Sequence, residues 1–320
     1  MGAELISLIM PVYNRERYVR EALESLISQT YSPLELIVVN DGSTDGTGRV
    51  LEELRPECEK RFARVEFLSQ ENQGTATTLN RLFEAAQGRY VYRLDSDDLA
   101  RPEAVETLQA FLRNHPDYGL AVGDDELINA EGRRVFWTKD RRFVEDPAQA
   151  RYLTFAQWLK DLRPEIDFSS DDFGGYESLL NGNYIPGGYL VRRELMQGIR
   201  FSSEAPLEDH FMMLRLARIT KMKYIDQVLY SYRWHGQNSI VNRKKSRSFS
   251  RRTLKYELED LLKSNDPKLA ALAEERLSRV KKKSKLKLGR LMELYKLSYV
   301  DRIEYRLRLG SGDFLLKAER

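Results

Sequence analysis

Four short apolar runs alternate with amphipathic stretches over the first 95 residues of this chain. The runs occupy residues 5–10, 34–39, 65–68 and 90–92. Between them apolar residues recur every three or four positions, as between Val19 and Ile27, which is the spacing of a helix that packs on a sheet. Strands that alternate with such helices predict an α/β fold with a doubly wound, mainly parallel sheet and right-handed crossovers.

Beyond residue 100 the pattern is less regular. We expect a helix at 102–114, a strand at 120–123, an irregular aromatic-rich segment at 129–183, a strand at 185–191, a helix that begins near 208, a strand at 224–232, and helices at 254–262 and 268–297. The sequence thus predicts one α/β domain over residues 1–241, with halves at 1–125 and 126–241, and a helical C-terminal extension over 242–320.

Each of the first four predicted strands ends in a polar turn. The turns are Tyr13-Asn14, Asn40-Asp41-Gly42, Asn72-Gln73-Gly74 and Asp95-Ser96-Asp97-Asp98. Since the carboxyl ends of parallel strands share one edge of an open sheet, and ligands bind at that edge, we expect these turns to converge on a ligand site.

The acidic turn carries three carboxylates, which repel one another unless a cation or solvent neutralises them. Oxygen ligands suit Mg²⁺ or Mn²⁺, which commonly bridge a carboxylate to substrate phosphates. A solvated acidic turn that caps the next helix explains Asp95, Asp97 and Asp98 equally well when they are taken alone.

Other candidates also have two interpretations. Asp41 suits a nucleobase or ribose contact, or an ordinary turn. The turn at 72–74 suits a pyrophosphate at a helix N-terminus, or a plain N-cap. Glu208 or Asp209 suits a general base, or an acid that complements a helix dipole. His235 suits a metal or phosphate contact, or a structural histidine. No glycine-rich dinucleotide fingerprint or P-loop occurs.

Charge is distributed unevenly along the 320 residues. Residues 1–241 carry a net charge of −9, whereas 242–320 carry +12. A basic tail indicates docking to a membrane surface, an acidic partner or a polyanionic acceptor, or a solvated helical face. Cations surround leucines at 281–297, which suits a membrane-surface or a dimerisation helix.

Several features of the sequence favour a cytoplasmic location. It has no long apolar run, no signal-peptide pattern and one cysteine, Cys58. We expect a cytoplasmic protein, with peripheral contact at the inner face of a membrane as a second option.

Taken in order, these pieces resemble the family-2 inverting glycosyltransferases, which have the GT-A fold. The resemblance covers residues 5–240 and rests on Pro11-Val12-Tyr13-Asn14, Asp41 to Asp45, Asn72-x-Gly74 with Asn80, Asp95-Ser96-Asp97-Asp98, Glu208-Asp209 with Arg215 and Leu216, and Tyr232-Arg233-Trp234-His235 with Asn238-Ser239.

The resemblance implies a nucleotide-diphosphate sugar donor, most often a UDP-sugar, and an acceptor hydroxyl on a polysaccharide, lipid-linked oligosaccharide or protein, with no nucleic-acid partner. Residues 1–125 would then bind the donor and 126–241 the acceptor. Asp41 would contact the base and Asp95 the ribose or metal, while Asp209 would be the catalytic base of an inverting transfer. Asp97, Asp98 and His235 would hold Mn²⁺ or Mg²⁺. The implied donor-binding residues are Pro11, Tyr13, Asn14, Asp41, Asn72, Gly74, Asp95, Ser96, Asp97 and His235.

Two other functions remain open at this point. A sugar-nucleotide pyrophosphorylase would need a glycine-rich, basic first loop, and the chain has Pro11-Val12-Tyr13-Asn14 there instead. A non-catalytic module that binds sugar nucleotides or glycans would have no need of a base at Asp209.

Overall fold

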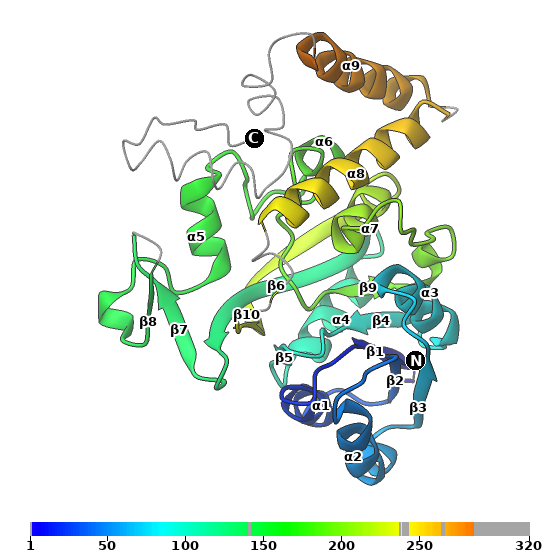
Figure 1. The fold of residues 1–320 in the computed structure, drawn as a ribbon, viewed down its shortest axis with the longest axis vertical. Helices are drawn as coiled ribbons and strands as arrows, with labels where there is room; N and C mark the ends of the chain where they lie inside the picture. The colour runs from blue at the N-terminus through cyan, green and yellow to red at the C-terminus, as the bar shows by residue number, and fades with distance from the viewer. Residues whose placement is uncertain (1, 140–141, 237, 239–242, 264–265, 285–320) are drawn as a thin grey trace. The chain divides into compact units, whose positions relative to one another are not determined.

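The structure, a computed structural model, describes residues 2–139, 142–236, 238, 243–263 and 266–284 (Figure 1). Its strands are β1 (Ile6–Val12), β2 (Leu34–Asp41), β3 (Arg64–Gln70), β4 (Tyr90–Arg93), β5 (Leu99–Ala100), β6 (Tyr118–Asn129), β7 (Arg134–Trp137), β8 (Phe143–Val144), β9 (Leu190–Arg192) and β10 (Lys221–Trp234). Its helices are α1 (Val19–Ile27), α2 (Thr47–Arg61), α3 (Thr75–Ala85), α4 (Ala104–Asn114), α5 (Phe155–Leu162), α6 (Tyr176–Leu179), α7 (Glu208–Leu216), α8 (Arg243–Leu261) and α9 (Pro267–Ser284), with short 3-10 turns at Pro147–Gln149 and Arg193–Met196.

One sheet joins most of the strands in the order β3-β2-β1-β4-β9-β6-β10-β5. The first four pair in parallel, and β10 pairs in parallel with β6. The short strand β9 is antiparallel to both β4 and β6, so β6 and β10 run in the same direction as β1. The prediction of an α/β fold with a mainly parallel sheet is therefore confirmed.

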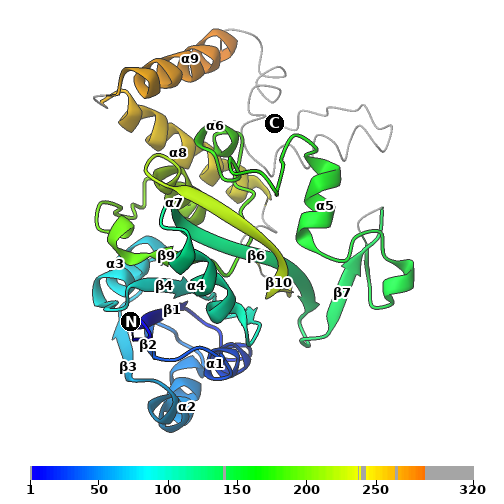
Figure 2. The ribbon, with the colours of Figure 1, turned by 180° about the vertical axis from the view of Figure 1, so that it is seen from behind.

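Alternate residues of the central strands face opposite sides of the sheet. Ile6, Leu8, Met10 and Val12 of β1 belong to one buried cluster with apolar residues of α1, α2 and α4. Helix α3 packs on β1 and β2, and the chain reverses its direction across the sheet between β3 and β4, so α3 covers the other face. In Figure 2, which views the sheet from behind, α4 lies over β6.

A buried carboxylate ties the amino ends of three strands together. Glu35 of β2 is fully buried and accepts hydrogen bonds from Ser7 Oγ of β1, from Arg64 Nη1 of β3, and from the backbone N–H groups of Gln87 and Gly88 before β4. Burial by itself would raise the pKa of Glu35, but these hydrogen bonds outweigh it and lower the pKa below its usual value. This anchor lies at the sheet edge opposite to the polar turns.

Replacing Glu35 by Ala is expected to lower the free energy of unfolding by about 3–5 kcal/mol, because Ser7, Arg64 and the Gln87 N–H lose the buried carboxylate as their acceptor. Urea denaturation measures the loss. Since the folded pKa of Glu35 is depressed, the difference between wild type and variant is fully present above the unfolded pKa of about 4.3 and shrinks as pH falls through the folded pKa.

The matched control for this variant is Glu66→Ala. Glu66 also pairs with Arg64, but its side chain is one-third exposed, so its removal is expected to cost less than about 1 kcal/mol. Equal losses for the two variants would contradict the role given to Glu35.

Several expected elements differ in the structure. Helix α4 begins at Ala104, two residues later than predicted, and the Ala104 N–H donates to the Arg101 carbonyl in the turn before it. The segment 129–183 is not irregular: it contains the β7–β8 hairpin and α5, whose cap is Thr154 accepting from the Gln157 N–H. Of the strand expected at 185–191, only residues from Leu190 onward pair with neighbours.

The described residues form two compact units. The first comprises residues 2–175, 185–201 and 216–238 within the described ranges, and the second comprises 176–184, 202–215 and the described part of the chain after 243. The predicted boundary at 241/242 stays a prediction. Of the basic stretch at 281–297, residues 281–284 form the end of α9, and residues 285–297 lie outside the described residues. No helix in the described part of the chain has the length and apolar character to cross a membrane.

Candidate functional site

The loop after β1 joins the loop after β2 at the carboxyl edge of the sheet. The Asn14 N–H donates to Ser43 Oγ at 2.9 Å, and Asn14 Oδ1 accepts from the Thr44 N–H at 2.8 Å. Asn14 has a φ of 50°, in the left-handed region that asparagine tolerates better than most residues. Tyr13, one residue earlier, is 45% exposed at the carboxyl edge of the sheet, while Pro11 lies within β1 itself.

Asp41 holds the turn after β3 in place. Its Oδ1 accepts from Gln70 Nε2 and from the Gln73 N–H, and its Oδ2 accepts from the Gly74 N–H at 2.9 Å. Gly42 packs so closely that a Cβ there would lie 2.6 Å from the Asn72 nitrogen, at a φ of 73°. The carboxylate that was predicted to meet the base therefore accepts hydrogen bonds from the loop that begins α3, and its contact with a base stays a prediction.

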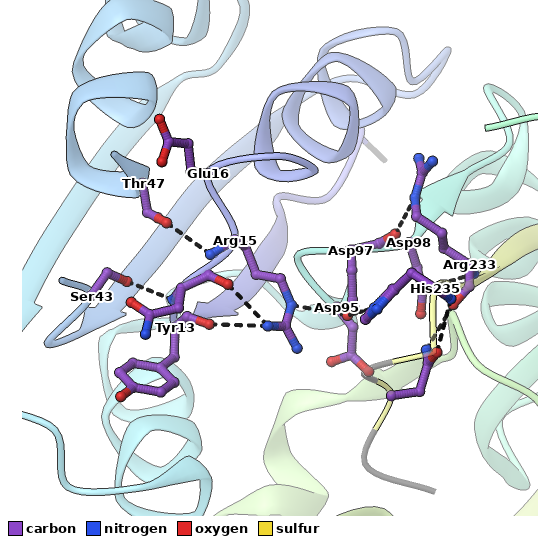
Figure 3. Close-up of polar contacts among 12 residues, drawn as sticks. Tyr13, Arg15, Glu16, Ser43, Thr47, Asp95, Asp97, Asp98, Arg233 and His235 are labelled. Atoms are coloured by element: carbon purple, nitrogen blue, oxygen red, sulfur yellow. Dashed lines mark hydrogen bonds and ion pairs between the residues drawn. The ribbon is translucent and has the colours of Figure 1, made fainter. Parts of the chain in front are cut away.

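The acidic turn meets the side chains of Arg15 and His235, which come from distant parts of the chain (Figure 3). Asp97 Oδ2 accepts from Arg15 Nε at 2.9 Å and lies 3.0 Å from His235 Nε2, which is 138 residues further along. Arg15 Nη1 also donates to the carbonyls of Tyr13 and Asn14, so it fixes the β1 loop against the turn. Although burial opposes it, the hydrogen bond from His235 and the charge of Arg15 lower the pKa of Asp97.

His235 is held in place from two sides. Its ring stacks on Tyr18 with centroids 4.9 Å apart, and its backbone N–H donates to Asn238 Oδ1. The imidazole is only 1% exposed, so its Nε2 faces Asp97 rather than open solvent. The structure thus brings His235 and Asp97 together, with the histidine positioning the carboxylate.

Asp98 points inward, away from its neighbour Asp97. It is 1% exposed, its Oδ2 accepts from Tyr230 Oη at 2.5 Å, and its Oδ1 accepts from the Arg233 N–H at 2.7 Å. Burial, together with the charges of Asp97 and Asp95, raises the pKa of Asp98 well above its usual range. The resemblance implied that Asp98 holds the metal. In the structure both of its oxygens instead accept hydrogen bonds from β10 and so tie the turn to that strand.

The remaining residues of the turn are divided between surface and interior. Asp95 accepts from Arg93 Nη2 at 2.8 Å and keeps 39% of its side chain exposed, whereas Ser96 is buried. Asp95 and Asp97, whose side chains are 39% and 13% exposed, are thus the two carboxylates of the turn that keep some contact with solvent.

The carboxylate oxygens of this turn suit a divalent ion that takes its remaining ligands from water and substrate phosphates. Within the described residues no three His, Cys, Asp or Glu side chains are arranged to enclose a metal. Mg²⁺ usually keeps several waters and takes one or two carboxylates plus substrate phosphates, so Asp97 with Asp95 is a sufficient protein contribution.

Asp209 and the other named residues lie in different units. Asp209 is the second residue of α7 in the helical unit, whereas Asn14, Asp41, Asn72, Asp97 and His235 all belong to the first unit. In its own unit α7 is fixed by the Leu207 N–H donating to Thr253 Oγ1.

The sequence did not predict a role at the site for Arg15 or Tyr18. Neither belongs to a spacing pattern, because both act through contacts with residues that are far away along the chain. A signal existed for Arg15 alone: clustered carboxylates at a sheet edge need neutralisation, and it is the first cation after β1. Cys58 is fully buried in α2, and this burial raises the pKa of its thiol to about 11, which does not favour a reactive thiolate.

The chain belongs to the glycosyl transferase family 2, whose family model matches residues 7–178. Chondroitin synthase of Escherichia coli is 39% identical over 241 residues, which are 75% of this chain and 30% of that protein, so this chain spans less than a third of that relative.

Two solved structures share the fold. Staphylococcus aureus TarS 1–349 in complex with UDP-GlcNAc has a TM-score of 0.53 and 18% identity over 90% of this chain and 79% of its own. The mannosyltransferase PcManGT of Pyrobaculum calidifontis, in complex with GDP-Man and Mn²⁺, has a TM-score of 0.55 and 15% identity over 98% of this chain and 89% of its own. At these identities the likeness supports the GT-A fold alone.

Proposed function

We propose that this protein is a metal-dependent, inverting glycosyltransferase that moves a hexosyl group from a UDP-sugar to an acceptor hydroxyl in surface polysaccharide, glycolipid or glycoprotein synthesis. The observation that carries the proposal is the cluster of Arg15, Asp97 and His235, which draws the ends of β1, β4 and β10 to one point. The nucleotide-sugar complexes of TarS and PcManGT support the donor class, and the Mn²⁺ of PcManGT supports the metal.

In this proposal Asp97 and Asp95 hold Mn²⁺ or Mg²⁺, which when bound neutralises charge on the diphosphate that leaves. His235 and Arg15 keep the Asp97 carboxylate ionised and oriented. Asp98 fixes the turn to β10 through Tyr230 and Arg233. Tyr13 and the loop at 72–74 bound the space for the nucleotide. Asp209 takes the proton from the acceptor hydroxyl.

A panel of UDP-sugars and GDP-sugars, each with and without Mn²⁺, tests the function by nucleoside diphosphate release. The expected result is release that depends on the metal and on one donor sugar. Pyrophosphate release would show a pyrophosphorylase instead, and nucleotide binding without turnover would show a binding module. NMR of the product's anomeric carbon tests the inversion.

Replacing Arg15 by Met is expected to tighten the binding of Mn²⁺ to the nucleotide-free protein, on the order of tenfold. The reason is that the guanidinium and the ion compete for the same carboxylate and repel each other. Loss of the free-Mn²⁺ electron paramagnetic resonance signal during titration measures the affinity. Arg17→Met, which removes a mostly exposed cation paired with Glu131, is the control. Weaker Mn²⁺ binding to Arg15→Met would contradict the competition.

The basic C-terminal extension, residues 242–320, adds a second part to the proposal: a cytoplasmic enzyme contacts the inner face of a membrane, or a second copy of itself, through this extension. Removal of α8 would be a poor test, because Arg215 of α7 pairs with the buried Glu257 of α8 at 2.7 Å. Truncation after Ser284 keeps that pair. Sedimentation with phosphatidylglycerol vesicles and light scattering then compare the two chains.

A further inference from the structure

The three tryptophans of the chain lie in one row of aromatic rings, although they come from three separate stretches. Trp137 of β7 stacks on Trp158 of α5, with ring centroids 5.3 Å apart and planes 18° from parallel. Phe143 of β8 lies 6.4 Å from Trp137 and 5.6 Å from Trp234 at the end of β10. Phe155 extends the row beyond Trp158, at 5.6 Å.

These rings do not form the buried core of the hairpin. That core consists of other residues, including Val135, Phe136 and Leu159, which are at most 6% exposed. Phe143 is 40% exposed, and the three tryptophans are each partly exposed. Neighbouring aromatic rings that each stay partly exposed to solvent, outside the buried core, mark a candidate binding surface.

The row begins beside the proposed donor site. Trp234 directly precedes His235, whose Nε2 lies 3.0 Å from Asp97. From there the rings lead onto the β7–β8 hairpin, which continues from the end of β6 through the pairing of Leu127 with Val135 and projects away from β1–β4 in both views (Figures 1 and 2). All of these residues belong to the first unit.

We propose that this row of Phe143, Trp137, Trp158 and Trp234 binds the sugar rings of an oligosaccharide acceptor. The inference rests on the proposed function and names its acceptor class. A pyranose ring is apolar on its faces and polar at its rim, so it stacks on an open aromatic surface while its hydroxyls stay hydrated. The binding free energy of an alkyl chain grows with the apolar area removed from water. A row of partly exposed rings removes less of that area than an enclosed pocket does.

Tryptophan fluorescence reports on this surface alone, because the described rings include every tryptophan of the chain. Chitohexaose, cellohexaose and a hyaluronan hexasaccharide are titrated against the full chain and against Phe143→Ala and Trp137→Phe. We expect at least one hexasaccharide to change the emission of the wild type. Phe143→Ala should weaken its binding on the order of tenfold, and Trp137→Phe, which keeps a ring, should weaken it less.

Phe83→Ala is the matched control, since Phe83 stacks on Phe201 at 5.8 Å outside the row. It should bind the hexasaccharide within twofold of wild type, and UDP affinity by calorimetry should be unchanged in all variants. The inference is overturned if no hexasaccharide changes the emission, if Phe143→Ala binds as wild type does, or if phosphatidylglycerol vesicles act and saccharides do not.

The two proposals fail in different ways. If a donor is turned over while saccharide binding is absent or insensitive to Phe143→Ala, the glycosyltransferase proposal stands and the acceptor platform falls. If no donor is turned over but the hexasaccharide binds through Phe143, the platform stands and the transfer function falls.

Discussion

Asp97→Asn is expected to slow nucleoside diphosphate release about a thousandfold at saturating donor, because the variant loses the one carboxylate that Arg15 and His235 jointly orient. Asparagine keeps the shape of the side chain but not its charge, so under the proposed function the metal would keep only Asp95 of its two carboxylates. Mn²⁺ binding, measured by electron paramagnetic resonance, should weaken together with turnover. Coupled measurement of nucleoside diphosphate gives the rate.

Asp172→Asn is the control for a change of charge alone, since Asp172 is exposed in a turn far along the chain from the cluster. Its rate should match the wild type. Asp98→Asn gives a sharper comparison. An amide at this buried site can still accept from the Arg233 N–H, so Mn²⁺ binding should change less than in Asp97→Asn. Full activity of Asp97→Asn, or an equal loss of Mn²⁺ binding in Asp98→Asn, would overturn the division between the two aspartates.

Asp209→Asn is expected to lower kcat about a thousandfold and to leave donor binding unchanged, because an amide cannot take the proton of the acceptor hydroxyl. The proposed base sits in the first turn of α7, where the helix dipole favours a negative charge. The helix is fixed in its unit by Thr253 at one end and by the pairing of Arg215 with Glu257 at the other. Single-turnover kinetics with the best donor measure the chemical step.

Glu208→Gln is the matched control for Asp209→Asn, since the two acids are neighbours in the same helical turn and complement the same dipole. If both residues only stabilise the helix, both variants should lose a few tenths of a kcal/mol of stability and keep their activity. A selective loss of kcat in Asp209→Asn supports a base. Retained kcat in Asp209→Asn, or an equal loss in both variants, would reject Asp209 as the base.

The apolar runs predicted the central sheet well, because a strand covered on both faces must be apolar almost throughout. The strands predicted at 5–10 and 34–39 are β1 and β2, and each ends two residues later than predicted. The hairpin at 134–144 and helix α5 escaped prediction. Their strands are two to four residues long and α5 has eight residues, too short for a periodic pattern to stand out.

The convergence of the polar turns could likewise be derived from the sequence. Parallel strands with right-handed crossovers must end at one edge, and Asn14, Asp41 and Asp97 do lie in loops that bond to one another there. The sequence by itself thus determined the fold class, the edge that carries the site and the residue types available at it, since these follow from local periodicity and chain direction.

Only the tertiary structure decided what each side chain does at that edge. Asp97 and Asp98 are adjacent and chemically identical, yet one faces Arg15 and His235 and the other is buried against Tyr230 and Arg233. The tryptophans at 137, 158 and 234 likewise became one surface through packing. Such orientations depend on partners 80 to 140 residues away, and no local pattern encodes which of two neighbouring side chains will meet them.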